Sequence, residues 1–152
     1  MQIILWKVKL KMKKMSYKIV SKYLKEIKYL VPNAEIYFNF PENIKDYRVV
    51  IDIKTQHYKN NIFEIENILS LNKKDEGNNH IEAKVVYSVL VELDENIPKD
   101  EIKNIFLVKV PAEIYPKLRK LFITTFESSG FKDIKVEETI DFRNLYQKKY
   151  NQ

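Results

Sequence analysis

Cysteine is absent from this 152-residue chain, and histidine and glycine each occur only twice. Without cysteine there can be no disulfide, no thiolate metal site and no cysteine nucleophile. Two glycines, Gly77 and Gly130, cannot build a glycine-rich phosphate-binding loop. His57 and His80 fall in polar stretches that we expect to be solvated loops, and no histidine–carboxylate cluster has metal-ligand spacing. These absences argue against an enzyme and against a bound metal or cofactor.

Long hydrophobic runs are missing as well. Near the N-terminus the longest uninterrupted apolar run covers residues 3–6, after which lysines alternate with apolar residues. A membrane-spanning helix needs about 18 or more apolar residues, and the core of a secretory signal needs about 7 to 15. We therefore expect a cytoplasmic protein without a membrane span.

Positive charge is plentiful but unevenly placed. Residues 1–28 carry +8, from nine lysines and the single acid Glu26, whereas residues 29–152 hold 18 bases and 20 acids. We interpret residues 1–15 as a basic leader, either disordered or due to a start assigned upstream of the true one, and residues 16–152 as one domain. Nucleic-acid-binding proteins favour arginine for bidentate contacts, but arginine supplies only 3 of the 27 bases. Nucleic-acid binding is therefore kept only as an alternative function.

Apolar residues at a spacing of two predict strands. Segments 48–55, 62–71 and 80–93 alternate apolar with polar residues, and segment 105–110 is apolar on both faces, as in a buried strand. Segment 32–41 is bracketed by prolines, which predicts a short extended stretch. Short polar connections between the strands are typical of antiparallel neighbours. The predicted fold class is α+β, with a four-stranded antiparallel meander.

Two helices are expected to complete this fold. Residues 112–128 place apolar side chains at helical spacing, with Pro111 before the start and Gly130 after the end. Residues 140–150 predict a short amphipathic C-terminal helix. The longer helix would cover the sheet.

The chain holds more large apolar side chains than one sheet and one helix would bury. Ten tyrosines and eight phenylalanines contribute most of an aromatic content of 12%. A large apolar surface left over after folding is typical of a subunit interface or a binding groove. The sequence therefore favours a binding protein.

Several collinear motifs resemble the SecB family of cytoplasmic protein-export chaperones. PAEIYPKLR at 111–119 has the family's proline, apolar, aromatic, proline and arginine pattern, and Gly-Phe at 130–131 ends the helix as in the family. Residues 140–146 supply the family's apolar–Asp–Phe–x–x–Leu–Tyr tail. Residues 25–38 resemble its N-terminal motif, and YSVLVEL at 87–93 resembles one of its strands.

This resemblance implies a homotetramer, built as a dimer of dimers, that holds unfolded preproteins along apolar grooves without ATP or a cofactor. It also implies docking on the translocation ATPase SecA through an acidic patch on the sheet face. Glu26 keeps one acid of that patch, but Leu30 and Lys84 stand where the family has two others. We therefore expect weakened docking, because the lost and reversed charges would reduce electrostatic steering.

The groove cannot be located from the resemblance residue by residue. The aromatic side chains that we select as groove candidates are Tyr29, Phe38, Tyr115, Phe142 and Tyr146. An alternative to preprotein export is a SecB-type fold that serves another partner, such as an antitoxin-linked chaperone or an oligomeric scaffold.

Overall fold

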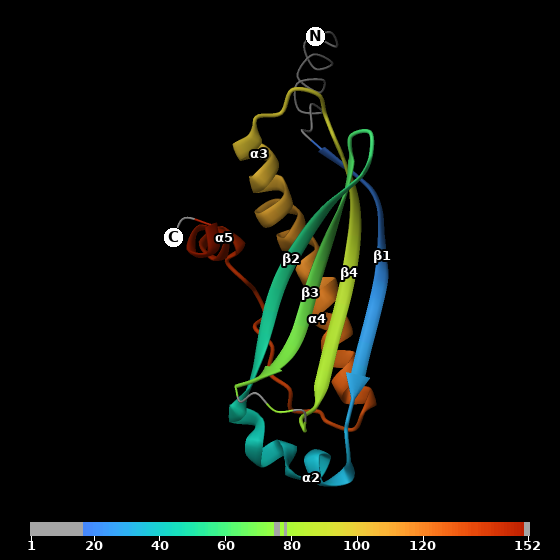
Figure 1. The fold of residues 1–152 in the computed structure, drawn as a ribbon, viewed down its shortest axis with the longest axis vertical. Coiled ribbons are helices and arrows are strands. Elements are labelled where there is room, and N and C mark those ends of the chain that lie inside the picture. The colour runs from blue at the N-terminus through green and yellow to red at the C-terminus, as the bar shows by residue number, and fades with distance from the viewer. Residues whose placement is uncertain (1–16, 75–76, 78, 151–152) are drawn as a thin grey trace, which may run out of the picture.

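The computed structural model describes residues 17–150, apart from residues 75, 76 and 78. Its four strands form one antiparallel sheet in the order β1-β4-β3-β2, and α4 crosses one face of that sheet (Figure 1). The predicted α+β fold with a four-stranded antiparallel sheet is therefore confirmed. The basic leader, residues 1–15, lies outside the described residues. The elements are β1 (Tyr17–Leu30), α2 (Ala34–Asn43), the 3-10 turn η1 (Ile44–Asp46), β2 (Tyr47–Lys59), β3 (Ile62–Lys73), β4 (Glu82–Leu93), α3 (Lys99–Asn104), the π-helical turn η2 (Ile105–Lys109), α4 (Val110–Ser128) and α5 (Phe142–Tyr150).

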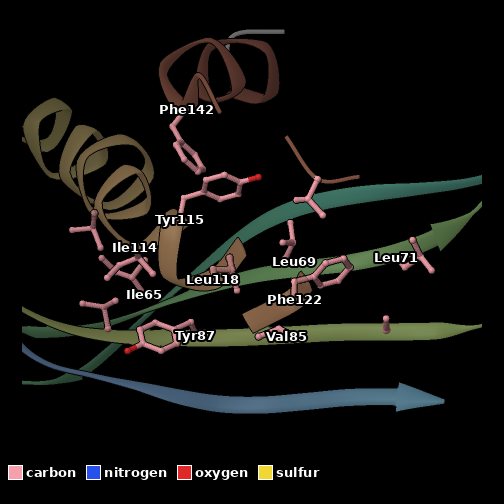
Figure 2. Packing of buried hydrophobic residues seen from close by; sticks show 14 of the residues in the cluster. Ile65, Leu69, Leu71, Val85, Tyr87, Ile114, Tyr115, Leu118, Phe122 and Phe142 are labelled. Atoms are coloured by element: carbon pink, nitrogen blue, oxygen red, sulfur yellow. The ribbon is translucent and has the colours of Figure 1, made fainter. Parts of the chain in front are cut away.

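The hydrophobic core lies between the sheet and α4. Alternate residues of β3 and β4 point toward α4, and Figure 2 shows Phe122 of α4 facing the strand residues Leu69 and Val85. This arrangement confirms the period-two pattern predicted for these strands. Core members with an exposed fraction of 2% or less include Ile65, Leu69, Val85, Val89, Val91, Ile114, Leu118, Phe122 and Phe126.

The fourth strand is β1, and not segment 105–110 as predicted. β1 pairs with β4 along its length, so the sheet is a three-stranded meander, β2-β3-β4, with the N-terminal strand added at the β4 edge. Its apolar residues lack clean alternation because the register shifts twice, between Ile19 and Ser21 and between Leu24 and Glu26. These irregularities and the high lysine content hid the strand from a periodicity search.

Segment 105–110 is helical, since α3 continues through η2 directly into α4. The N–H of Val110 donates to the carbonyl of Ile105, five residues earlier, as in a π-helix. Pro111 follows, and a proline lacks an N–H and crowds the carbonyl four residues before it. A wider turn relieves this crowding, so the π-turn immediately before Pro111 has a direct cause.

This helical turn is apolar on both faces because it is covered on both. Phe106 packs on Phe63 of β3, with ring centroids 5.2 Å apart. Leu107 instead lies beside Leu145 of α5. Two-sided burial therefore gave a helix the composition of a central strand.

Segment 32–41 is also helical where an extended stretch was predicted. Asn33 caps α2, because its Oδ1 accepts a hydrogen bond of 2.9 Å from the N–H of Ile36. Pro41 lies late in this helix, which ends at Asn43. A third difference concerns His57, which lies within β2 and not in a loop.

The C-terminal end of α4 has the predicted glycine stop. Gly130 has a φ of 96°, its N–H donates to Glu127, and the N–H of Phe131 donates to Phe126. This pair of bonds is a Schellman cap, which requires left-handed backbone at the glycine position. Residues 131–141, which we call the strap, then lead without helix or strand into α5.

Candidate functional site

A groove of about 820 Å³ lies between β2, the end of α2 with η1, and the strap. Figure 1 shows the strap passing alongside the start of β2 on its way to α5. Apolar side chains from β2, β3 and the strap line the inside of the groove. These include Val49, Ile51, Leu69, Leu71, Phe131 and Val136.

Charged side chains of both signs complete the lining of the groove, and all of them are exposed to solvent. Three are basic and three are acidic, so the rim has no strong net charge. An apolar floor with a polar rim binds chiefly by burial of apolar surface. The charged residues are Lys45, Arg48, Asp133, Lys135, Glu137 and Glu138.

Tyr115 of α4 fixes the strap wall of the groove. Its side chain is 3% exposed, and its hydroxyl donates to the backbone carbonyl of Glu137. Nearby, the Nε of Arg119 donates to the carbonyl of Val136 over 3.2 Å. Burial raises the pKa of Tyr115, so this hydroxyl stays protonated and remains a donor. The two α4 side chains therefore fasten the strap to α4.

Helix α5 follows directly after the strap. Phe142, at its start, is 3% exposed and meets the ring of Tyr115 edge-on at 5.9 Å, as Figure 2 shows. Further along α5, Lys149 forms an ion pair of 2.8 Å with Asp52 of β2. A small cavity of about 40 Å³ lies beneath α5, where Tyr146 faces β2. Helix α5 is thus fastened to the core at one end and to β2 at the other.

The residues that the structure describes contain neither a metal-ligand cluster nor a helix suited to span a membrane. No group of three or more histidine or acidic side chains is arranged to hold a metal ion. Likewise, none of the described helices is long and apolar enough to cross a membrane.

Comparison with known proteins identifies the family. Residues 11–152 match the family described as preprotein translocase subunit SecB. A SecB protein-export protein of Pelagibacter ubique is 32% identical over 90% of this chain and 98% of its own length. The chain belongs to the SecB family. The protein-export protein SecB of Xanthobacter autotrophicus is 23% identical, over 90% of this chain and 86% of its own length.

A solved structure shares the SecB fold of this chain. It is a SecB-like chaperone of Mycobacterium tuberculosis in complex with a ChAD peptide from an antitoxin. The match has a TM-score of 0.60 and 11% identity, and it covers 91% of this chain and 97% of the other. Membership of the SecB family supports a role as a chaperone in protein export, and it confirms the resemblance found in the sequence motifs.

The five predicted groove residues of this SecB protein lie in different environments. Tyr115 lines the groove, and Phe142 packs behind it in the core. Tyr146 faces the small cavity under α5. Tyr29 is half-buried on β1, at the edge of the sheet away from β2, where its ring meets Phe126 of α4 at 5.2 Å. Phe38 is 83% exposed on α2, three residues before the groove-lining Pro41.

The predicted SecA-docking residue, Glu26, lies on the sheet face opposite α4. Its carboxylate pairs with Lys84 of β4 across 3.1 Å. On the same face Lys25 pairs with Glu64 at 3.1 Å and with Glu66 at 2.6 Å. Lysines of this chain therefore neutralise acids on this face.

Sequence reasoning missed the apolar floor of the groove. The alternation of Val49, Ile51 and Ile53 marked one face of a strand, which the structure confirms. It could not show that this strand would be an edge strand. The signal that could have helped is the long strap after Gly130, since a connection without secondary structure is often part of a binding site.

Proposed function

We propose that this SecB protein is an ATP-independent holdase of the cytoplasm. It binds unfolded preproteins in the groove and delivers them for export. The observation that carries the proposal is the groove itself, with an apolar floor, a mixed charged rim and a volume of about 820 Å³. The peptide bound to the SecB-like chaperone of the same fold gives it further support.

The physical basis of the proposal is that the burial of apolar surface is non-directional. A chaperone must hold segments that share no fixed sequence, and apolar burial stabilises any such segment by about 25 cal/mol per Å². The chemistry of the groove needs no nucleotide, because release can follow when the client transfers to a partner or folds. As the SecB family consists of chaperones, family membership also supports the prediction that the protein is not an enzyme.

The predicted aromatic residues have distinct proposed roles. Tyr115 contacts the client and fixes the strap, while Phe38 extends the apolar surface beyond the mouth of the groove. Phe142 and Tyr146 position α5, and Tyr29 stabilises the β1 side of the core.

A homotetramer, arranged as a dimer of dimers, is proposed as the working assembly. Strand β1 is an edge strand, and Val20, Leu24 and Ile27 on it are 44–47% exposed. An apolar edge strand left open in a single copy would favour association. Light scattering should therefore give four times the chain mass of 18.3 kDa.

The partner that receives the client is proposed to be SecA, bound weakly. The paired acids of the sheet face support weak binding, because they offer little net negative charge to a basic partner. A second candidate is a client other than a preprotein, since the SecB-like chaperone of the same fold was solved with an antitoxin peptide.

The holdase proposal is tested by dilution of a chemically unfolded preprotein into buffer without nucleotide. Stoichiometric chaperone should suppress light scattering, and Ile134→Asp in the groove lining should reduce this effect several-fold. Tyr58→Asp, which changes a side chain 59% exposed outside the groove, is the matched control and should behave as wild type. Aggregation that is unaffected by the wild-type protein would contradict the proposal.

A further inference from the structure

The start of β1 and the turn between β2 and β3 lie side by side at one end of the sheet (Figure 1). Tyr17, the first residue of β1, pairs with Leu93, whose N–H donates over 2.9 Å to the carbonyl of Asn61 in the turn. The basic leader precedes β1 and therefore joins the domain at this end. We call residues 1–22 together with residues 54–61 the leader end.

Exposed lysines of the leader end lack ion-pair partners. Residues 54–61 are all exposed and contain no acid. Five other lysines lie 2.6–3.1 Å from a carboxylate, but four lysines at this end form no ion pair in the described part of the chain. Positive charge that no neighbouring acid offsets remains available to an anionic partner. The four residues are Lys18, Lys22, Lys54 and Lys59.

The leader raises the positive charge of this end further. It adds five lysines and no acid, whereas Glu92, Asp94 and Glu95 are exposed acids at the end of β4 and in the turn after it. Nine lysines against three acids leave six positive charges, which equals the net charge of the whole chain. The remainder of the chain is therefore close to neutral, as the groove rim is. The lysines of the leader are Lys7, Lys9, Lys11, Lys13 and Lys14.

Aromatic and apolar side chains accompany these lysines. Tyr58 is 59% exposed in the turn region, and the ammonium group of Lys59 lies 5.3 Å from the centre of its ring. The leader has four consecutive apolar residues that end at Trp6, after which lysines alternate with apolar residues as far as Lys13. Tryptophan and tyrosine favour the interface between a membrane and water, and lysine favours anionic headgroups. The leader end therefore combines the side chains of a peripheral membrane contact.

Two other occupants fit this composition less well. A nucleic acid binds through its phosphate charges and through stacking of its bases on aromatic rings, and it offers no environment for the aliphatic residues 3–5. The groove of the protein itself has three basic and three acidic side chains on its rim, so it offers no excess of acid to the lysines of the leader. A bilayer with anionic lipids accommodates both the aliphatic side chains and the positive charges.

We propose that the leader end binds the surface of a bilayer that contains anionic lipids. Its lysines contact the headgroup phosphates, while Trp6 and its apolar neighbours enter the interface and Tyr58 lies at the headgroup level. Because one short apolar segment and a few lysines carry the contact, it is weak and reversible. Along β2, Lys59 lies about 26 Å from Ile51 of the groove floor at the usual rise per residue, so the groove stays open on the bound protein. This membrane contact goes beyond the holdase proposal and does not depend on it.

Trp6 is the only tryptophan of the chain, so the intrinsic tryptophan fluorescence of the full-length protein reports on the leader alone. Vesicles of phosphatidylcholine with about a third of phosphatidylglycerol should shift its emission to shorter wavelength at low salt, and high salt should weaken this effect. Vesicles of phosphatidylcholine alone should leave the emission unchanged. No shift, or an equal shift with the neutral vesicles, would overturn the inference. Emission already at short wavelength in buffer and unchanged by vesicles would also overturn it, because the leader would then pack against its own protein.

Matched sets of lysine substitutions, all of which keep Trp6, test the location of the contact. A leader variant should lose about tenfold or more in affinity for the anionic vesicles, and a turn variant about threefold or more. A control variant loses three exposed lysines of α4 and the strap and should bind within about twofold of wild type. Equal losses in the leader and control variants, or wild-type affinity in the turn variant, would overturn the inference. The variants are Lys9→Gln with Lys11→Gln and Lys13→Gln for the leader, Lys54→Gln with Lys59→Gln for the turn, and Lys117→Gln with Lys120→Gln and Lys132→Gln for the control.

Polyuridylate in place of vesicles tests the nucleic-acid alternative in the same assay. We expect it to bind more weakly than the anionic vesicles at equal salt, because it cannot take up the apolar residues before Trp6. Tighter binding of polyuridylate than of vesicles would make the leader end a nucleic-acid site and overturn the membrane contact.

Discussion

The ammonium group of Lys84 lies 3.1 Å from the carboxylate of Glu26, across the β1–β4 pair. Both side chains are more than one third exposed, so the pair contributes at most about 1 kcal/mol to stability. The main effect of this ion pair is on the electrostatic potential of the sheet face. Glu26 is the residue that we predict to dock SecA, and Lys84 offsets its charge.

We predict that Lys84→Glu strengthens SecA binding several-fold at low salt, with the gain disappearing as salt is raised. The substitution frees Glu26 and changes the local charge by two units, which increases steering of a basic partner. Affinity for purified SecA at two salt concentrations is the measurement. Lys117→Glu, on the exposed side of α4, is the control for net charge. Equal effects of the two variants would show that this face does not dock SecA.

Stability at low pH should depend on Glu64. The hydroxyl of Tyr23 is the largest influence that lowers the pKa of Glu64, and Ser88 and Lys25 also donate to this carboxylate. Because the folded-state pKa is lower than in the unfolded chain, the stabilisation is complete above the ordinary value of 4.5 and is lost as pH falls through the lowered pKa.

Glu64→Gln should therefore lower the free energy of unfolding by about 1 kcal/mol at pH 7 and reduce its loss on acidification. Urea unfolding at pH 7 and at about pH 3 measures both effects. Glu42→Gln, at an exposed position of α2, serves as control. If the free energy of unfolding of Glu64→Gln depends on pH as in the wild type, Glu64 is not the source of the loss of stability at low pH.

Tyr115→Phe should loosen the strap without disturbing the core. The ring and its contact with Phe142 remain, but the bond to the carbonyl of Glu137 is lost. We expect the free energy of unfolding, measured by urea unfolding, to fall by about 1 kcal/mol. Affinity for an unfolded preprotein, measured by calorimetry, should fall a few-fold. Tyr58→Phe, which alters an exposed hydroxyl outside the groove, should change neither. Unchanged affinity for the unfolded preprotein in Tyr115→Phe would show that the strap does not contribute to client binding.

Phe38→Ala should separate binding from stability. This ring is 83% exposed, so its removal should change the free energy of unfolding by less than about 0.5 kcal/mol. If it extends the client surface, affinity for a long unfolded client should fall several-fold. Tyr58→Ala removes another exposed ring, on β2, and should leave affinity unchanged. Equal affinities for the two variants would exclude Phe38 from the client surface.

Much of the fold could be predicted from local patterns in the sequence. The three strands β2, β3 and β4, helix α4 with its stop at Gly130, and helix α5 each turn regularly spaced apolar side chains toward the core, which produces a clear period of two or 3.6. The SecB motifs lie mostly in these same elements. Local pattern and tertiary structure agree wherever an element has one buried and one exposed side.

The errors occurred where burial or register was unusual. Segment 105–110 is buried on two sides and so resembled a central strand, while its helical form depends on continuity with α4 and on the π-turn before Pro111. Two register shifts and abundant lysine hid β1. For α2 the prediction rested on the two flanking prolines and did not use the capping of the helix by Asn33.

The site was predicted only in part, because a groove is a property of the assembled chain. Tyr115 lines the groove, Phe142 lies in the core and Tyr29 packs against the core, and the role of these side chains in client binding stays a prediction. The floor at Val49 and Ile51 becomes accessible because β2 has no neighbour on its outer side. Periodicity gives the face of a strand but not its place in the sheet.

Hydrogen exchange of the protein, with and without a chemically unfolded preprotein, tests most directly whether clients occupy the groove. Bound client should slow amide exchange at residues 47–51 of β2 and in the strap, while the sheet face around Glu26 and Lys84 exchanges as in the free protein. Unchanged exchange at 47–51 and in the strap, with saturating client bound, would place the client elsewhere and contradict the account.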